Sequence, residues 1–388
     1  MVDAAAPVTV GIVAGEASGD ALGASLIMAA RERLPHVRFA GIGGPKMAAA
    51  GCEVWVPSEK LAVRGFAEVL RHLPGIARIR RGLRLRLLAQ RVPLFVGVDA
   101  PDFNLGLERS LKARGVRTIH LVSPSVWAWR RERIARIARS VDRMLALFPF
   151  EPPLYRDAGV RVGFVGHPLA QHAASDWSRR TMRERLGIRL ATPVFALLPG
   201  SRVSEVEMHA APVIGAAQRI ARVRPDAQFL VPLVSRPTRE LFEQALWRAG
   251  AGDLPVTLLY GHATDALRAA DVALVASGTA TLEAALARCP HVVFYRVAAL
   301  TAAIVRRRLL VPWVGLPNVL AGRFVVPELL QDDATPENLA QAALNLFDDS
   351  ETRRALESLF AGFARTLAAD TGALAAQALA EELAAAAS

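Results

Sequence analysis

The chain is poor in cysteine and has no long apolar segment. Cys52 and Cys289 are its two cysteines, too few for a disulfide scaffold and without the spacing of a zinc finger. No uninterrupted apolar run reaches the ~18 residues of a membrane span, since the most apolar late stretch, 298–320, contains three arginines and two prolines. The first residues include Asp3 and lack a basic segment, so no secretory signal is predicted. We expect a cytoplasmic protein.

Aromatic residues are also scarce, at 6% of the 388 residues. The chain is nevertheless 52% hydrophobic and 21% charged, which excludes a disordered, collagen-like or low-complexity protein. At this length, two to three domains of about 150 residues each are expected.

Acidic residues are under-represented in the first half of the chain. Residues 1–165 contain 25 lysines and arginines against 14 aspartates and glutamates, whereas residues 166–388 contain 22 of each, and the net charge is +11. A positive field of this kind attracts nucleic acid, anionic lipid or a phosphorylated substrate. An arginine-rich genome composition is the alternative explanation of the total excess, but it explains the asymmetry less well.

The apolar pattern alternates between short β-branched runs and helical segments, which predicts parallel α/β layers. Strands are expected at 8–14, 93–98, 116–122, 143–147, 161–165, 194–198, 228–234, 256–259, 271–276 and 291–295, with helices such as 20–34 and 101–114 between them. Two successive arrays of this kind predict an α/β fold with two Rossmann-like, doubly wound lobes facing a central cleft. We place the lobes at 1–170 and 171–345, with a linker over 166–180 and a helical tail over 346–388 that could pack on the first lobe.

Ligands of open α/β sheets bind where strands end and helices begin, and five such turns here are polar or rich in glycine. The first, GEASGD, lacks the G-x-G-x-x-G spacing of a dinucleotide site. Its glycines would let a ligand approach the backbone, with Glu16 and Ser18 beside it. Alternatively, Ser18 or Asp20 caps the following helix.

The second and third turns combine acidic, aromatic and basic side chains. Asp99 ends a predicted strand, where a carboxylate can act as a general base, although Asp99 or Asp102 could instead cap the next helix. In the third turn, Trp127 and a second tryptophan two residues later stand beside Arg130 and further arginines. Such a group can stack a sugar or a base and bind a phosphate, or it can be a hydrophobic plug under a loop.

The fourth turn, LPGSR, has the composition of an anion site. Gly200 and Ser201 form a small turn that suits an anion at a helix N-terminus, and Arg202 adds a bidentate phosphate donor. Ser204 and Glu207 have the spacing of a capping box, which predicts that a helix starts there. The lysine of a Walker loop is absent, so phosphoryl transfer from ATP is not expected.

The fifth turn, SGTATLE, also leads from a strand into small hydroxyl residues at a helix N-terminus. Its candidate ligand residues are Ser277, Gly278, Thr279, Ala280 and Glu283. Glu283 would repel a phosphate, so hydrogen bonds from the two hydroxyls of a ribose suit it better. The fourth and fifth turns together predict a nucleoside diphosphate site in the second lobe. Asn318 lies in a further loop bounded by proline and glycine, where turn formation is the simpler role.

Seven motifs occur in one order along the chain: GEASGD, GIGGPKM, GVDAPDFN, SPSVWAWR, LPGSR-x-x-E, SGTATLE and LPNVLAG. In these motifs the chain resembles the lipid-A-disaccharide synthases, over about residues 8–328. The resemblance implies a glycosyltransferase of the GT-B architecture. Its donor would be UDP-2,3-diacylglucosamine and its acceptor the 6-hydroxyl of lipid X, which is 2,3-diacylglucosamine 1-phosphate. The products would be a β-1,6-linked lipid A disaccharide 1-phosphate and UDP, early in lipid A biosynthesis of Gram-negative bacteria.

The resemblance also implies roles for particular residues. Asp99 corresponds to the general base, and Glu16 and Ser18 correspond to the acceptor side, where we also place Trp127 and Arg130. The residues expected at the UDP donor are Gly200, Ser201, Arg202, Ser277, Gly278, Thr279, Ala280, Glu283 and Asn318. No metal and no cofactor are expected. Gln171 stands where many relatives have an aspartate, so no carboxylate role is carried over to that position.

Segment 66–88 is the expected membrane contact. Its apolar residues at helical spacing are Phe66, Val69, Leu70, Leu73 and Ile76, and six arginines are interspersed with and follow them. We expect Pro74 and Gly75 to break the helix. Apolar side chains beside arginines suit a segment lying on an anionic membrane surface, here the inner face of the inner membrane. An amphipathic helix with a solvated basic face is the alternative.

Three other functions are compatible with the residues alone. One is a UDP-sugar transferase or epimerase with another substrate, and another is a nucleotide-binding module without catalysis. The third is a nucleic-acid-binding protein, suggested by a pI of about 10.8. The sequence has no zinc spacing, RNP-type motif or clear helix-turn-helix, so we expect no nucleic-acid partner. A homo-oligomer is left open.

Overall fold

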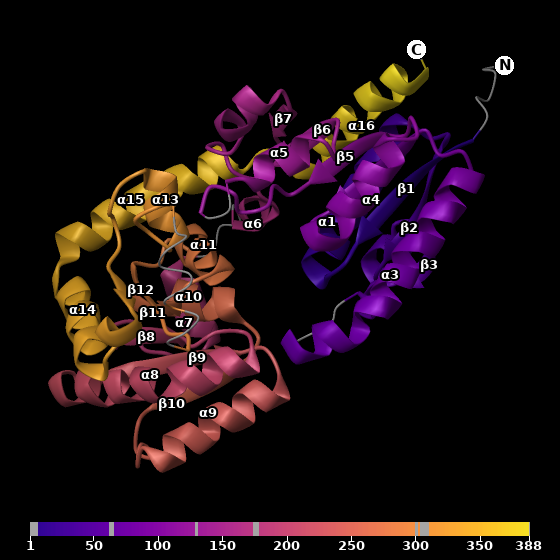
Figure 1. The fold of residues 1–388 in the computed structure, drawn as a ribbon. Coiled ribbons are helices and arrows are strands. Elements are labelled where there is room, and N and C mark those ends of the chain that lie inside the picture. Colours follow the sequence, from indigo (N-terminus) through magenta and orange to yellow (C-terminus); the bar gives the residue numbers. More distant parts are fainter. Residues whose placement is uncertain are drawn as a thin grey trace. The chain divides into compact units, whose positions relative to one another are not determined.

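The computed structural model describes residues 7–61, 66–128, 131–173, 178–298, 302 and 310–387, and the side chains of 66–73, 172, 173 and 387 lie outside this description. The chain divides into two compact units (Figure 1). Unit 1 comprises residues 1–171 and 367–388, and unit 2 comprises residues 172–366. Each unit is built on one parallel sheet flanked by helices, which confirms the predicted α/β class with two doubly wound lobes.

The sheet of unit 1 has seven parallel strands in the order β3-β2-β1-β4-β5-β6-β7. Its strands are β1 (Val8–Ala14), β2 (Val37–Gly43), β3 (Cys52–Pro57), β4 (Leu94–Val98), β5 (Arg117–Leu121), β6 (Arg143–Ala146) and β7 (Arg161–Phe164). The helices are α1 (Ala17–Arg33), α2 (Pro45–Ala49), α3 (Phe66–Ala89), α4 (Pro101–Lys112), α5 (Arg133–Ala138), α6 (Pro168–Ala173, which runs to the boundary between the units) and α16 (Thr371–Ala387).

The sheet of unit 2 has six parallel strands in the order β10-β9-β8-β11-β12-β13. Its strands are β8 (Val194–Leu198), β9 (Gln228–Leu233), β10 (Val256–Tyr260), β11 (Val272–Ala276), β12 (His291–Tyr295) and β13 (Glu328–Leu330). The helices are α7 (Arg179–Arg185), α8 (Val203–Val223), α9 (Arg236–Arg248), α10 (Ala263–Ala269), α11 (Thr279–Leu286), α13 (Leu316–Ala321), α14 (Pro336–Asp348) and α15 (Ser350–Leu367).

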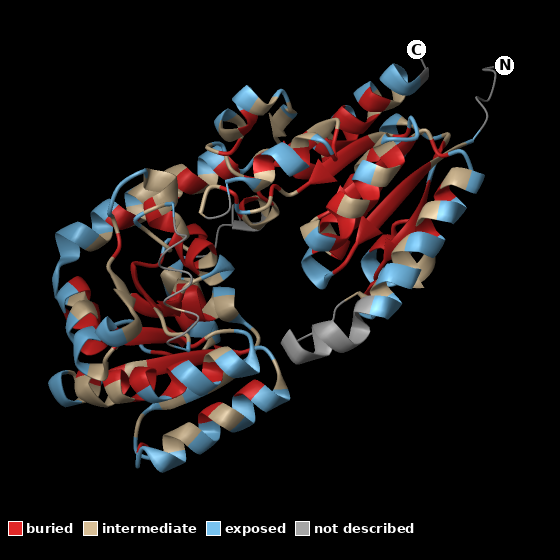
Figure 2. Ribbon diagram, viewed as in Figure 1, coloured by how far each residue is buried: buried red, intermediate tan, exposed pale blue. Residues whose placement is uncertain are grey.

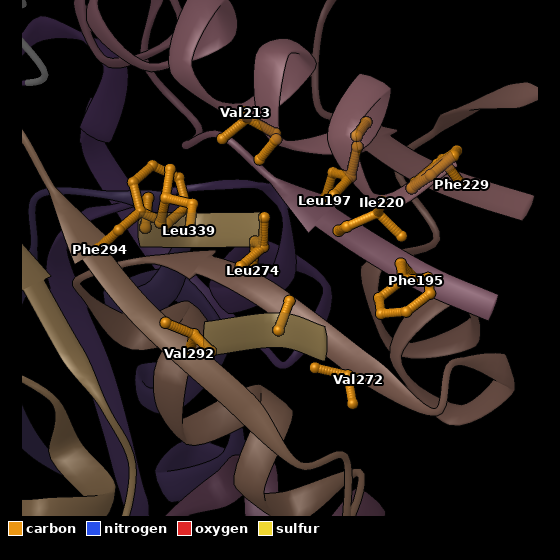
Figure 3. Close-up of a cluster of buried hydrophobic side chains, with 14 of the residues drawn as sticks. Phe195, Leu197, Val213, Ile220, Phe229, Val272, Leu274, Val292, Phe294 and Leu339 are labelled. Atoms are coloured by element: carbon orange, nitrogen blue, oxygen red, sulfur yellow. The ribbon is translucent and has the colours of Figure 1, made fainter. Parts of the chain in front are cut away.

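The central strands are buried along their whole length (Figure 2). Because helices cover both faces of a parallel sheet, such strands read as continuous apolar runs, as in VFALL of β8. In unit 2, Phe195 and Leu197 of β8 pack with side chains of α8 such as Val213 and Ile220 (Figure 3). This core fixes the carboxyl ends of the strands, where the polar turns begin.

Three strands were not predicted from the sequence. β2 contains Gly41 and Gly43, which lower its β propensity, and β13 has only three residues; β3 was missed as well. Gly41 has φ +152°, and a Cβ atom there would lie 2.0 Å from the carbonyl oxygen of Ile12. This glycine therefore allows β2 to pair closely with β1.

Two expectations about helices need correction or adjustment. The predicted break at Pro74 is wrong, because α3 runs through that residue. The tail was expected from residue 346, whereas the chain returns to unit 1 at Leu367. Phe360 of α15 lies in the core of unit 2, while α16 packs on α1. The expected linker, 166–180, contains α6 and the start of α7.

No helix among the described residues is long and apolar enough to cross a membrane.

Candidate active site

Four of the five predicted turns lie at the switch points of the two sheets. In unit 1, β1 and β4 are neighbours, and the strand order runs away from them in opposite directions. β8 and β11 occupy the same position in unit 2. Ligands of open α/β sheets bind outside the carboxyl ends of strands at this point. The turns that begin at Gly15, Asp99, Pro199 and Ser277 follow these four strands.

The turn after β1 leaves two side chains exposed. Glu16 and Ser18 are exposed at the start of α1, and no side chain caps this helix. Asp20, a predicted cap, is buried and accepts hydrogen bonds of 2.8–3.1 Å from the amides of Gly44, Lys46 and Met47. The expectation that Ser18 or Asp20 caps α1 is therefore wrong, because Asp20 caps α2 instead.

Asp99 is held by its backbone rather than by its side chain. Its amide donates to the carbonyl oxygen of Leu121 at 2.8 Å, and its own carbonyl accepts from Nδ2 of Asn104 at 2.8 Å. The N-cap of α4 is Ala100, without a side-chain cap, so the alternative that Asp99 or Asp102 caps this helix is wrong. Among the described residues, no group hydrogen-bonds to the half-buried Asp99 carboxylate. The oxygens of that carboxylate are therefore available to a ligand.

The third turn belongs to an aromatic cluster. Trp127 meets Phe150 edge to face at 5.5 Å between ring centroids, and Phe150 stacks on Phe148 at 5.4 Å. Arg130, the second predicted residue of this turn, lies outside the described residues. The two phenylalanines were not predicted as part of this site, although FPFE directly follows the predicted fourth strand.

A buried polar group lies beside this cluster. Oγ of Ser123 and Oη of Tyr155 are 2.7 Å apart. Glu151 is buried and accepts from the amide of Phe148 at 3.0 Å. Burial raises the pKa of Glu151 to about 7.

The turn after β8 already binds a carboxylate. Glu205 accepts hydrogen bonds from the amides of Ser201 and Arg202 at 2.9 and 3.2 Å, and from the Arg202 guanidinium at 2.9 Å. Helix α8 begins at Val203, so the predicted capping box of Ser204 and Glu207 is wrong. Gly200 has φ +121°, and a Cβ there would meet Glu205 at 2.6 Å. The donors of this turn are thus arranged around an anion.

His209 was not predicted, yet it fixes this turn. It is fully buried on α8, and its Nδ1 lies 2.7 Å from the carbonyl oxygen of Pro199. Its Nε2 accepts from the amide of Arg296 at 3.0 Å. The imidazole therefore joins the ends of β8 and β12. The position of His209, one helical turn after Glu205, could have indicated from the sequence that it contacts this turn.

The turn after β11 combines open backbone with one desolvated carboxylate. Gly278 and Thr279 are exposed, Ala280 is half-buried, and Gly278 has φ +144°. Ser277 donates to the carbonyl oxygen of Val314 at 3.1 Å. Burial raises the pKa of Glu283, and no described residue pairs with its carboxylate. Glu283 is thus available to accept hydrogen bonds from hydroxyl groups.

Asn318 organises the neighbouring loop from within. Its side chain is fully buried, donates to Val326 O and Glu328 Oε1, and accepts from the amides of Val325 and Val326, all at 2.7–2.9 Å. Every hydrogen-bonding group of the amide is engaged within the chain. This arrangement does not support the expected contact between Asn318 and a ligand; Asn318 positions the loop that Ser277 contacts.

No group of three or more His, Cys, Asp or Glu side chains within the described part of the chain could hold a metal ion.

Two doubly wound lobes with polar turns at both switch points are the hallmark of the GT-B architecture. Among solved structures, the fold is similar to the glycotransferase of kitacinnamycin (TM-score 0.61, 19% identity, 97% of this chain and 99% of that one). It is also similar to the UDP-GlcNAc 2-epimerase of Neisseria meningitidis bound to UDP-GlcNAc (TM-score 0.60, 11% identity, 97% and 99%). These similarities show that the chain has the GT-B fold.

The family follows from the sequence comparisons. The family model described as Lipid-A-disaccharide synthetase matches residues 10–379. The Lipid-A-disaccharide synthase of Chromobacterium violaceum is 53% identical over 372 residues, which cover 96% of each chain. The chain therefore belongs to the lipid-A-disaccharide synthase family and is a UDP-sugar glycosyltransferase of lipid A biosynthesis.

Proposed function

We propose that the chain transfers 2,3-diacylglucosamine from UDP-2,3-diacylglucosamine to the 6-hydroxyl of lipid X, with inversion at the sugar C1. Membership of the family supports the choice of substrates, and the observation that carries the mechanism is the Asp99 carboxylate at the switch point of unit 1. Its backbone is anchored on both sides, and no described group hydrogen-bonds to its side chain. A general base needs this combination of fixed position and free acceptor oxygens.

In the proposed reaction, the acceptor oxygen attacks C1 of the donor sugar while the bond from C1 to the UDP oxygen breaks. Asp99 takes the proton of the acceptor hydroxyl, and the bonding electrons leave with UDP. The amides of Ser201 and Arg202 and the Arg202 guanidinium stabilise the departing diphosphate in place of the Glu205 carboxylate. Glu283 accepts hydrogen bonds from the ribose.

The acceptor is proposed to meet unit 1. The exposed Glu16 and Ser18 adjoin β1, next to the strand that ends at Asp99. Trp127 lies in the turn after β5, the strand that pairs with β4, and offers an apolar ring there. The excess of positive charge in residues 1–165 suits a phosphorylated acceptor.

Product analysis tests the proposal. Purified protein is incubated in detergent with both substrates, and the lipid product is examined by mass spectrometry and by the proton coupling at the new anomeric centre. A β-1,6-linked disaccharide 1-phosphate is expected. An α-linked product contradicts the inversion, and a product lacking the 1-phosphate contradicts lipid X as the acceptor.

We also propose that α3 brings the protein to an anionic membrane surface. Arg78, Arg81 and Arg86 are exposed on α3, and Leu85 is 54% exposed beside them. Replacing Phe66, Leu70 and Leu73 with glutamine should reduce flotation with vesicles containing anionic lipid. The matched control is Met28→Gln, an exposed apolar residue of α1. Equal flotation of both variants and the unmodified protein would remove α3 as the contact.

A further inference from the structure

A buried polar cluster lies directly behind the turn that carries Asp99. Asn104, Glu108 and His120 are all 0% exposed. Asn104 and Glu108 are one turn apart on α4, and His120 is on β5. Polar groups withdrawn from water in this way are costly unless they are paired.

One short contact joins the helix to the strand. Nδ1 of His120 and Oε1 of Glu108 are 2.7 Å apart. Gly97 of β4 faces His120 across the strand pairing, and a Cβ atom on Gly97 would lie 2.2 Å from Oε1 of Glu108. The glycine of the GVD motif thus leaves room for the pair.

The pair is not explained by stability alone. Oε2 of Glu108, Nε2 of His120 and Oδ1 of Asn104 are buried without hydrogen-bond partners among the described residues. Buried ion pairs are often replaceable by apolar side chains without loss of stability, and native proteins contain few unsatisfied buried groups. A cluster with three of them calls for a functional explanation.

The same two elements hold the Asp99 backbone. The Asp99 amide donates to Leu121 of β5, and the Asp99 carbonyl accepts from Asn104 of α4. Asp99 and Ala100 have φ values of +51° and +44°, a left-handed conformation that non-glycine residues adopt only when their surroundings enforce it. The contact between Glu108 and His120 ties α4 to β5, and so fixes the two anchors of this strained turn.

We propose that Glu108 and His120 form a positioning pair for Asp99, which holds the turn in its strained conformation and tunes the pH range over which the Asp99 carboxylate accepts a proton. The inference rests on the proposed role of Asp99 as general base. Neither residue of the pair touches substrate, because both are fully buried.

The charge balance around the pair supports this role. Burial disfavours the charged imidazole, but the charge and hydrogen bond of Glu108, together with Asp99, raise the pKa of His120. Burial also raises the pKa of Glu108. Asp99 is thus one of the charges that act on His120, so the pair and the Asp99 carboxylate interact electrostatically.

The charged groups on the surrounding elements include two arginines of α3 and one carboxylate of α16. On α3, Arg80 lies against Gly106 and Arg84 donates to Ser110. On α16, Glu382 binds Arg117 at the opposite end of β5. Met144 of β6, which pairs with His120 in the sheet, is apolar.

A double-mutant cycle tests the proposal. Glu108→Gln keeps an acceptor for Nδ1 of His120 and removes the charge, and both this change and Asp99→Asn are measured singly and together. We expect Glu108→Gln to lower kcat by about tenfold or more, with the KM for the donor within about twofold, and to shift the acidic limb of the pH profile of kcat/KM upward. In the Asp99→Asn background, the same change should cost less than about twofold, because coupled residues are not additive.

The outcomes separate this inference from the proposed function. The inference is overturned if the loss is equal in both backgrounds or if the pH profile does not move. If Asp99→Asn itself keeps full activity, the proposed function fails and the inference fails with it. His291→Asn, another fully buried histidine, located in unit 2, is the control and should leave the pH profile unchanged. If Glu108→Gln does not fold, His120→Asn, which places an amide near the Nδ1 position, runs the same cycle.

Discussion

At the scale of single residues, the acidic side chains near β1 and β4 have separate tasks. Asp20 caps α2, Glu108 contacts His120, and Asp102 is 87% exposed and lies 3.4 Å from Arg133. The Asp99 carboxylate has no such engagement among the described residues. This difference separates Asp99 from Asp20, Glu108 and Asp102, and its place at the end of β4 with an anchored backbone is the reason for assigning the proton transfer to it.

Asp99→Asn should lower kcat by about 10²- to 10⁴-fold, because the amide cannot accept the proton of the acceptor hydroxyl. Binding of UDP should not change, since the proposed donor residues are all in unit 2. The measurements are steady-state kinetics and calorimetric titration with UDP. Asp102→Asn, three residues further on, is the control and should stay within about twofold of the unmodified protein. Near-normal turnover of Asp99→Asn would exclude Asp99 as the base.

At the scale of elements, most strand positions could be predicted from the sequence, but the side chain that caps α2 could not. The expected strands 8–14, 194–198 and 291–295 match β1, β8 and β12 at both ends, because continuous apolar runs mark buried parallel strands. The two turns proposed to bind the UDP donor could be located for the same reason, because they directly follow β8 and β11. The cap of α2 comes from elsewhere in the fold, because Asp20 reaches it from α1, 24 residues from Gly44. No local pattern contains that information.

The roles of Asn318, His209 and the aromatic cluster also could not be predicted from a local sequence pattern. A polar residue in a Pro/Gly loop has the same sequence pattern whether it meets a ligand or the chain itself. Only the fold shows that residues 325–328 engage every hydrogen-bonding group of the Asn318 side-chain amide. Likewise, Trp127 follows β5 and Phe150 follows β6, so only the fold shows that their rings are in contact.

Helix α16 is attached to the sheet of unit 1 by a charged cluster around one buried carboxylate. Glu382 is 0% exposed and contacts Arg117 and Arg161. Glu382→Ala should therefore lower the free energy of unfolding by about 2 kcal/mol, because it removes charge-assisted hydrogen bonds from Arg117 and Arg161. Glu381→Ala is the matched control: its side chain is 43% exposed, and a change of less than about 1 kcal/mol is expected. Urea unfolding compares the two, and equal effects would contradict this account of α16.

At the scale of the whole molecule, two buried histidines couple stability to pH, one in each unit. Burial lowers the pKa of His167 and of His291 to about 4. The ordinary histidine value is about 6.5, so between pH 6.5 and 4 the unfolded chain binds more protons than the folded one. Stability from each group is complete above pH 6.5 and is lost as the pH falls toward 4. Glu151 acts in the opposite direction, because its raised pKa of about 7 makes the folded chain the stronger proton binder below that pH.

His291→Asn should remove one of these contributions. The slope of unfolding free energy against pH between 6.5 and 4.5 should decrease by about 1.4 kcal/mol per pH unit. Urea unfolding at several pH values gives this slope, and His36→Asn, a change outside the buried core, should leave it unaltered. An unchanged slope in His291→Asn would show that His291 is not held neutral by the fold.

The proposed transferase must use its donor and its acceptor in one reaction. The most direct test is UDP release from UDP-2,3-diacylglucosamine in detergent, measured with and without lipid X. We predict release that requires lipid X and equals the amount of disaccharide 1-phosphate formed. UDP release that is the same without lipid X would contradict the acceptor assignment, and tight UDP binding without any turnover would contradict the assignment of this chain as the transferase.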